Sequence, residues 1–264
     1  MARAPFFSAI VSLYLGLSLL LPALPCRAAN VNEPETTDHP PVPGAKPLDP
    51  SFVPVTDDPK LPRVLIIGDS ISIGYTIPVR QLLAGKANVH RPPANCGDTA
   101  RGLKNLDRWL ATDKTAANGG KWDVITFNFG LHDLKYLDAN GKYVDPSKGK
   151  QVAPPPLYEK NLRELVVRLK ATGAKLIWVN TTPVPAGTLG RIAGDEVPYN
   201  KVAAKVMAEN GIPTVDLYSV AESDLEDYQR PRNVHFTPAG WHALAEAVAA
   251  GIEKSLATPA TLPG

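Results

Sequence analysis

Short apolar runs that alternate with amphipathic segments are the feature of this sequence that most limits its possible folds. The run at 64–67 is continuously apolar and ends at Gly68, as expected of a strand buried on both faces of a sheet. Further strands are predicted at 122–127, 175–179 and 213–217, with an edge strand at 87–90.

Helices are predicted between these strands, because apolar residues recur there at helical spacing. Positions i, i+3, i+4 and i+7 of one helix face are occupied by Leu162, Leu165, Val166 and Leu169. Further helical patterns cover 103–110, 202–207 and 241–252. The alternation predicts a three-layer α/β domain with a mainly parallel sheet, whose ligand crevice lies beyond the carboxyl ends of the strands.

The length and charge of the chain favour a single domain with a small or neutral partner. With 264 residues, 44% of them apolar, the chain can bury a sizeable core. Lys and Arg number 28 and Asp and Glu number 26, without a basic stripe, so nucleic acid is not an expected partner. A monomer is expected.

Residues 1–28 are predicted to form a signal peptide. A positive start precedes an apolar stretch at 6–24, and small residues near Ala28 suit a cleavage site. The alternative is a retained transmembrane anchor, which Pro22 and Pro25 disfavour. Cleavage implies export to the periplasm or the cell exterior, with no stable membrane span afterwards.

The rest of the chain divides into three parts. Residues 29–61 carry many prolines and no regular period, so they are predicted to be a flexible or polyproline-like linker. The domain is placed at 62–257, and residues 258–264 are expected to be a flexible tail.

Cleavage of the leader would leave Cys96 as the only cysteine, so no internal disulfide is expected. No activating base is evident near Cys96. We interpret it as a packing residue rather than a reactive thiol.

The first of four polar segments follows the strand at 64–67 and reads Gly-Asp-Ser-Ile-Ser. Ser70 is expected at the strand-to-helix turn, where its hydroxyl can attack a substrate. Its backbone N–H, near a helix N-terminus, can stabilise an oxyanion. The alternative is ordinary turn and N-cap chemistry, which uses the same residue types.

The second and third segments offer further hydrogen-bond donors. Gly97, in the segment at 95–99, can let its backbone approach an acyl group, although a turn glycine explains it equally well. In the segment at 127–133, His132 is either a third donor or a solvated loop histidine, and Asn128 can support the loop.

The fourth segment, at 233–240, precedes the last predicted helix. Thr237 is expected as the N-cap of that helix with Pro238 at its first position, which holds His235 in a fixed loop. An imidazole with a pKa near neutrality suits a serine as general base and a leaving alcohol as proton donor. His235 is therefore the predicted partner of Ser70.

These four segments, in this order, resemble the sequence blocks of the SGNH/GDSL hydrolases, over residues 63–257. The resemblance implies a flavodoxin-like fold with a five-stranded sheet, a catalytic pair of Ser70 and His235, and ester or thioester hydrolysis through an acyl-enzyme. It also implies an oxyanion hole made by the backbones of Ser70 and Gly97 and the side chain of His132, with no metal and no organic cofactor.

Two positions depart from the family pattern. The family usually has Asn at the position of His132, and an imidazole N–H can replace it only in the right tautomer. The family also usually has Asp three residues before the histidine, where this chain has Arg232. Asp224, Asp227 or a backbone carbonyl could substitute, or the third member could be missing.

Three functions remain open at this point. The leading hypothesis is an exported esterase that removes an acetyl or other short acyl group from a small-molecule or carbohydrate ester. The second is a ligand-binding protein without turnover, and the third is a lipase or thioesterase. Further residues that could support the site are Asp69, Asn128 and Asp133. The segment at 135–152 is expected to be a loop that either contributes specificity or is a solvated insertion.

Overall fold

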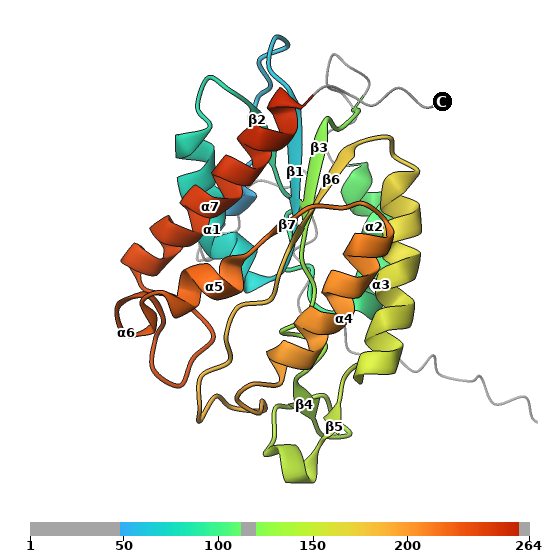
Figure 1. The fold of residues 1–264 in the computed structure, drawn as a ribbon, viewed down its shortest axis with the longest axis vertical. Helices are drawn as coiled ribbons and strands as arrows, with labels where there is room; N and C mark the ends of the chain where they lie inside the picture. Colours follow the sequence, from blue (N-terminus) through green and yellow to red (C-terminus); the bar gives the residue numbers. More distant parts are fainter. Residues whose placement is uncertain (1–47, 112–119, 259–264) are drawn as a thin grey trace, which may run out of the picture. The chain divides into compact units, whose positions relative to one another are not determined.

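The computed structural model describes residues 48–111 and 120–258, which form one parallel β-sheet with helices on both faces (Figure 1). The strands lie in the order β2-β1-β3-β6-β7, and all neighbours pair in parallel. They are β2 (Asn88–His90), β1 (Arg63–Ile67), β3 (Val124–Phe127), β6 (Lys175–Val179) and β7 (Thr214–Val215). The prediction of a flavodoxin-like α/β fold with a five-stranded sheet is confirmed.

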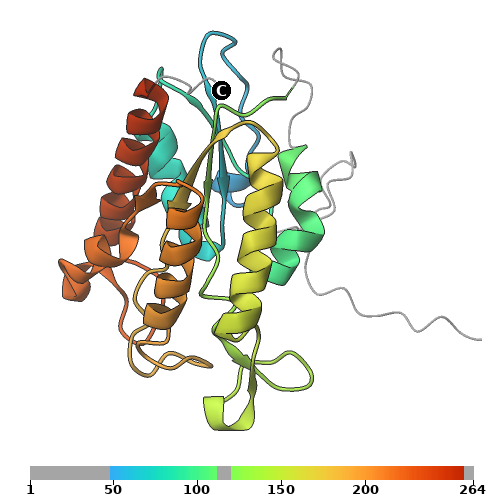
Figure 2. The same ribbon diagram turned by 45° about the vertical axis from the view of Figure 1, so that its right-hand side comes forward.

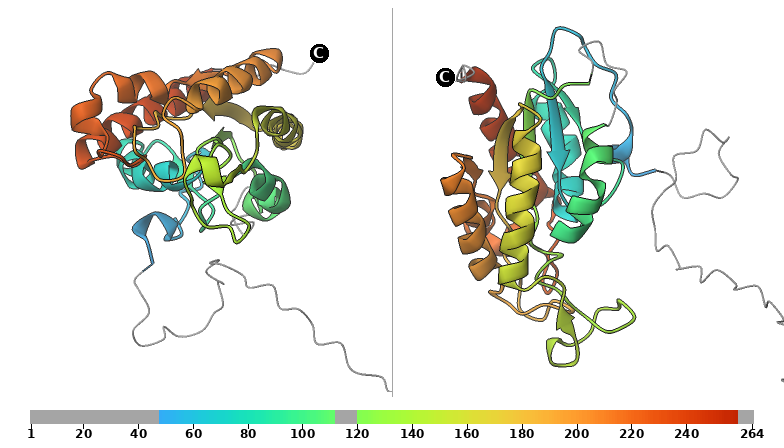
Figure 3. Two further views of the ribbon diagram at one scale, coloured as in Figure 1. Left: turned by 90° about the horizontal axis from the view of Figure 1, so that it is seen from below. Right: turned by 90° about the vertical axis from the view of Figure 1, so that its right-hand side faces the viewer.

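Two layers of helices cover the sheet, and Figures 2 and 3 show them from further directions. One layer holds α1 (Ser70–Leu82), α5 (Leu217–Glu222), α6 (Leu225–Tyr228) and α7 (Pro238–Ala257). The other holds α2 (Thr99–Leu110), α3 (Pro155–Lys170) and α4 (Glu196–Glu209). The short helices α5 and α6 lie in the stretch after β7, which carried no helical pattern.

The helical spacing in the sequence identified the buried faces. In α3, the predicted face is fully buried and consists of Leu162, Leu165, Val166 and Leu169. The strand β1 is buried along its whole length, because helices cover both faces of the sheet. This burial explains why residues 64–67 of this strand are continuously apolar rather than alternating.

The helices α1 and α7 pack side by side, and their packing brings the first and the fourth polar segments of the sequence close together. Gly74 of α1 contacts Trp241 of α7, and a Cβ on Gly74 would lie 2.6 Å from the indole ring. Each of the two residues lies about one turn after the start of its helix, so both helices begin at the same end of the sheet. Ser70 begins α1, and His235 lies just before α7.

The last part of the predicted linker is folded onto the domain. Residues 48–62, which we call the strap, contain the 3-10 helix η1 (Pro50–Phe52), and Ser51 within it is fully buried. For residues 48–61 the expectation of a flexible linker is therefore corrected. Residues 29–47 lie outside the described residues.

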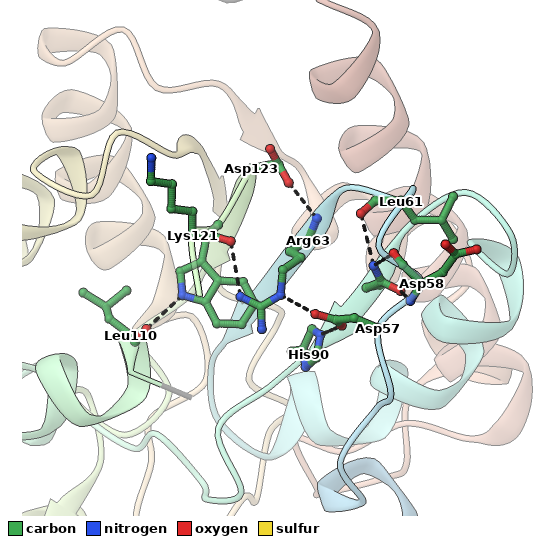
Figure 4. Close-up of polar contacts among 10 residues, drawn as sticks. Asp57, Asp58, Leu61, Arg63, His90, Leu110, Lys121 and Asp123 are labelled. Carbon is green, nitrogen blue, oxygen red and sulfur yellow. Dashed lines mark hydrogen bonds and ion pairs between the residues drawn. The ribbon is translucent and has the colours of Figure 1, made fainter. Parts of the chain in front are cut away.

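One carboxylate joins the strap to two strands of the sheet (Figure 4). Asp57 accepts a hydrogen bond from Arg63 Nε at 2.6 Å and lies 2.6 Å from His90 Nε2. Asn88 Nδ2 also donates to the carbonyl oxygen of Asp58 at 2.9 Å. These specific pairings, which composition does not reveal, hold the proline-rich strap in place.

The segment at 135–152 is a small hairpin rather than the expected plain loop. Its strands β4 (Tyr136–Leu137) and β5 (Lys150–Gln151) pair in antiparallel fashion, with the 3-10 helix η2 (Pro146–Lys148) between them. Figure 1 shows this hairpin beyond the end of the sheet that lies opposite the last turn of α7. The strands are two residues long, too short to give a readable alternation.

None of the helices in residues 48–111 and 120–258 has the length and apolar character needed to cross a bilayer. The predicted signal peptide at 1–28 lies outside the described residues. The helix α7 ends at Ala257, and of the predicted tail only Thr258 is described.

Candidate active site

Ser70 occupies the first position of α1, directly after the turn that ends β1. Asp69 is the N-cap of this helix, and its Oδ1 accepts a hydrogen bond from the backbone N–H of Ile71 at 2.9 Å. Within the described part of the chain, no group accepts a hydrogen bond from the backbone N–H of Ser70. This donor at a helix N-terminus is therefore available to a substrate oxygen.

The hydroxyl of Ser70 lies 2.8 Å from Nε2 of His235, although 165 positions separate the two residues in the chain. Both side chains are half-buried. The distance suits a hydrogen bond from the hydroxyl to a neutral imidazole. The arrangement can therefore move a proton from the serine to the histidine.

Asn233 fixes the tautomer of His235. Its Oδ1 lies 2.7 Å from His235 Nδ1 and also accepts the backbone N–H of His235 at 3.0 Å. Because that backbone N–H can only donate, the atom facing both groups is the amide oxygen, so Nδ1 carries the proton. Nε2 is then left unprotonated and can accept from Ser70.

The loop that carries His235 is held at both ends. Gln229 Nε2 donates to the carbonyl oxygen of Val234 at 3.3 Å. Thr237 is the N-cap of α7, as predicted, and Pro238 is the first residue of that helix. The position of the imidazole is therefore set by the start of α7.

The imidazole of His235 is kept neutral by its surroundings. Burial lowers its pKa, and the positive charges of Arg191 and Arg230 lower it further. A histidine whose pKa lies below the ordinary value of about 6.5 is unprotonated at pH 7 and can accept a proton.

The structure does not place either predicted substitute carboxylate against His235. Asp224 is exposed and caps α6 by accepting from the backbone N–H of Asp227. Arg232, at the position of the family's aspartate, is exposed and has a left-handed backbone with φ of 55°. Its side chain packs on Gly187, where a Cβ would lie 2.9 Å from Arg232 Cδ. The amide of Asn233 takes the place that these residues were expected to fill.

The segment with Gly97 is tied to the serine turn. The backbone N–H of Cys96 donates to the carbonyl oxygen of Gly68 at 3.2 Å. Gly97 has a φ of 66°, and a Cβ there would lie 2.8 Å from Arg101 Cδ, so the position suits only glycine. Its N–H donates to Asn95 Oδ1 at 3.0 Å, so a side chain occupies the predicted oxyanion donor.

Cys96 itself has no exposed surface, and burial raises the pKa of its thiol to about 11. A thiol of this kind stays protonated at neutral pH and is a poor nucleophile.

His132 is a neutral imidazole with a defined tautomer. Lys135 Nζ lies 3.1 Å from His132 Nδ1, and because an ammonium group can only donate, the ring proton lies on Nε2. Burial and the charges of Lys135 and Arg191 lower the pKa of His132 to about 3. His235 also acts on this pKa, so the two imidazoles lie within electrostatic range. The tautomer is the one that an oxyanion donor requires.

The remaining predicted residues support the loops. Asn128 Nδ2 donates to the carbonyl oxygen of Val179 at 2.8 Å and so ties β3 to β6. Asp133 Oδ1 accepts from the backbone N–H of Thr99 at 3.0 Å and from its hydroxyl at 2.6 Å, at the start of α2. Neither side chain contacts Ser70 or His235.

Sequence reasoning missed two residues. Asn233 was signalled only by its position two residues before a histidine, where an Asn often bonds back to the following backbone. Arg91 is buried and donates to the hydroxyl of Ser72 at 3.1 Å and to the carbonyl oxygens of Ala94 at 3.1 Å and Gly68 at 3.4 Å. It braces the serine turn against the Gly97 segment, and nothing in its sequence context indicated this.

The described residues hold no group of three His, Cys, Asp or Glu side chains that could bind a metal ion. A cavity of about 10 Å³ lies next to the serine turn, lined among others by Ile71, Tyr75 and Leu131. A cavity of about 910 Å³ lies among the amino ends of β3, β6 and β7, and neither Ser70 nor His235 lines it.

Comparisons with known proteins agree with this geometry. Residues 66–243 match the GDSL-like lipase/acylhydrolase family. A lipase/acylhydrolase from Enterococcus faecalis has 18% identity and a TM-score of 0.57, with 76% of this chain and 100% of that chain covered. An acetylxylan esterase from Geobacillus stearothermophilus, solved as a catalytic mutant, has 17% identity and a TM-score of 0.56, with 77% and 97% covered. No curated protein sequence matches.

The family match includes all four polar segments, from the turn with Ser70 to the start of α7 after His235. The chain therefore belongs to the GDSL-like lipase/acylhydrolase family and is a serine hydrolase that acts on ester bonds.

Proposed function

We propose that this protein is an exported esterase that removes a short acyl group, in the simplest case acetyl, from a carbohydrate. The observation that carries the catalytic part is the chain of contacts from Ser70 Oγ to His235 Nε2 at 2.8 Å and from His235 Nδ1 to Asn233 Oδ1 at 2.7 Å. It provides a nucleophile, a base and an orienting acceptor in the required order.

In the first half of the reaction, Ser70 Oγ attacks the ester carbonyl while its proton passes to Nε2 of His235. The oxyanion forms next to the free backbone N–H of Ser70. Rotation of the Asn95 side chain releases the N–H of Gly97 as a second donor, and His132 Nε2–H is the third. The leaving alcohol then takes the proton from His235, which leaves the acyl group on Ser70.

In the second half, His235 accepts a proton from water while the water attacks the acyl-enzyme. The bond between the acyl carbon and Ser70 Oγ then breaks, His235 returns the proton to Ser70 Oγ, and the acid is released. The Asn233 amide has no charge with which to stabilise the imidazolium, but it holds Nδ1–H in place. Replacement of the triad aspartate by asparagine costs a serine protease about 10⁴ in kcat because the tautomer is wrong. Here the backbone N–H of His235 fixes the amide oxygen of Asn233 toward the ring, which keeps the productive tautomer. We therefore do not expect the loss of kcat that the wrong tautomer causes.

One comparison supports a short acyl group on a sugar. Proteins of similar fold include acetyl xylan esterases. The N-terminal signal pattern supports export, and sequencing the mature N-terminus, expected near residue 29, tests that part.

The test is hydrolysis of p-nitrophenyl acetate, butyrate and longer esters, and acetate release from acetylated xylooligosaccharides, by protein expressed from the full sequence. Ser70→Ala is expected to lower kcat/KM by about 10⁴-fold or more while the protein stays folded. Acetate esters are expected to be the best substrates.

A rate that rises with acyl length would instead indicate a lipase or thioesterase. Folded protein without any Ser70-dependent hydrolysis would indicate a binding protein.

A further inference from the structure

Two cations and a tyrosine form a wall beside the serine site. We call Lys135, Tyr143 and Arg191 the cationic wall. Lys135 Nζ lies 5.2 Å and Arg191 Cζ lies 5.5 Å from the centre of the Tyr143 ring. Tyr143 is 39% exposed, and these distances are those of cation–π contacts, which hold both cations next to its ring.

The three side chains of the cationic wall are held in fixed positions, because the hairpin at 135–152 packs onto the loop before α4. The backbone N–H of Tyr136 donates to the carbonyl oxygen of Gly190 at 2.8 Å. A Cβ on Gly190 would lie only 2.6 Å from Tyr143 Cδ1. Lys135 and Tyr143 from the hairpin are thereby fixed against Arg191 from the loop.

The wall adjoins the catalytic groups. Arg191 donates from Nε and Nη2 to the carbonyl oxygen of Leu131 at 3.0 and 2.9 Å, and Lys135 donates to His132 Nδ1 at 3.1 Å. Leu131 and His132 belong to the third polar segment, at 127–133. Arg191 also lies close enough to His235 to lower its pKa.

Neither Lys135 nor Arg191 forms an ion pair with any carboxylate of the described residues. By contrast, Arg163 on the outer face of α3 pairs with two glutamates at 2.6 Å. Asp195, in the same loop as Arg191, accepts a hydrogen bond from the neutral Gln151 at 3.4 Å. Two positive charges therefore stand beside the serine with N–H donors left for an anion.

We propose that the cationic wall binds an anionic group, a carboxylate or a sulfate, on the sugar whose ester Ser70 hydrolyses. This inference rests on the proposed esterase function and names its substrate class, an acidic carbohydrate ester. The guanidinium of Arg191 suits a planar or tetrahedral oxyacid, and the ammonium of Lys135 adds a second charge.

The experiment compares three probes, each a methyl glycoside with one O-acetyl group: a glucuronate, a glucose 6-sulfate and neutral glucose. Acetate release is measured for the wild type, Arg191→Gln and Arg230→Gln. Arg230 is the matched control, because it also acts on the pKa of His235 but does not belong to the wall. Lys135→Gln is a second wall variant in case Arg191→Gln disturbs the loop.

The wild type is expected to prefer an anionic probe over the neutral one by about tenfold in kcat/KM, with the preference falling at high salt. In Arg191→Gln and Lys135→Gln the ratio falls toward one, and in Arg230→Gln it is retained. The two anionic probes show whether carboxylate or sulfate is recognised.

Ser70-dependent hydrolysis with equal rates on all three probes would overturn the wall and leave the esterase intact. If Arg191→Gln lowers kcat/KM by the same factor on all three probes, the proposal is also overturned, because Arg191 would then act on the oxyanion rather than on the sugar's anionic group. If no probe is hydrolysed, calorimetry measures the binding of the three deacetylated glycosides. Selective binding of the anionic glycosides that is lost in Arg191→Gln supports the cationic wall. The absence of selective binding in the wild type overturns it.

Discussion

Two histidines of this protein have a side-chain oxygen acceptor at nearly the same distance, but the acceptors differ in charge. His90, at the strap, lies 2.6 Å from the carboxylate of Asp57, which is also bound by Arg63. His235, at the serine, lies 2.7 Å from the neutral amide of Asn233. The pair with the carboxylate is structural, and the pair with the amide contacts the nucleophile.

The difference shows how charge is distributed between the two regions. In the strap both oxygens of Asp57 are engaged by cationic or ring nitrogens, so the cluster is suited to holding segments together. Around the serine, Asp69 and Asp133 each keep one buried oxygen without a hydrogen-bond partner among residues 48–111 and 120–258, and Lys135 and Arg191 form no ion pair with a carboxylate of these residues. Incomplete pairing of this kind is common where a protein retains groups for function at the expense of stability.

The largest contrast is expected from removing each histidine. His235→Ala removes the base and is expected to lower kcat/KM for p-nitrophenyl acetate by about 10³-fold. His90→Ala is expected to leave kcat/KM unchanged and to lower the urea midpoint of unfolding. A loss of activity in folded His90→Ala would break the division between the two regions.

The next effect concerns stability. Asp57→Ala removes a carboxylate that contacts both Arg63, which is 2% exposed, and His90, and is expected to lower the free energy of unfolding by about 3–5 kcal/mol. Asp227→Ala, on the exposed helix α6, is the control and is expected to change it by about 0.5 kcal/mol or less. Urea unfolding measures both. Equal values would mean that the strap is not anchored through Asp57.

The amide of Asn233 is tested by two substitutions. Asn233→Ala loses the acceptor for Nδ1–H and is expected to lower kcat by about 10²-fold, less than the 10⁴-fold loss caused by an enforced wrong tautomer. Asn233→Asp keeps the acceptor and adds a charge, which raises the pKa of His235.

Because the neutral imidazole is the active form, the acid limb of the pH–rate profile moves to higher pH in Asn233→Asp while the plateau is retained. An Asn233→Ala enzyme with the wild-type plateau would show that the amide does not orient the ring.

The smallest effect is a pH dependence of stability from Asp133. Burial raises its pKa to about 7, against the hydrogen bonds from Thr99, which lower it. The folded protein therefore holds a proton that the unfolded chain releases from about pH 4, so this group's contribution to stability is lost as pH rises from about 4 to about 7.

Asp133→Asn does not titrate. Its melting temperature relative to the wild type is expected to rise over this pH range and then to stay level. A constant difference would show that Asp133 ionises normally in the folded state.

The sequence was informative where local patterns carry their own physical reason. The sequence predicted the apolar run of β1, the helical spacing in α3 and the Thr237-Pro238 start of α7. With these elements it also predicted that Ser70 and His235 lie next to the starts of two helices. The strap was not predicted, because its fixation depends on Asp57 meeting a strand residue and a distant histidine. The role of Asn233 was not predicted either, because a family pattern directed attention to Arg232 and to distant carboxylates.

The central claim is that Ser70 is a nucleophile activated by His235, and reaction with a fluorophosphonate followed by peptide mass mapping tests it most directly. We expect one adduct per chain, on Ser70, in the wild type, a slower adduct at the same residue in Asn233→Ala, and none in His235→Ala. An adduct on another residue, or folded wild-type protein that stays unlabelled, would contradict the account.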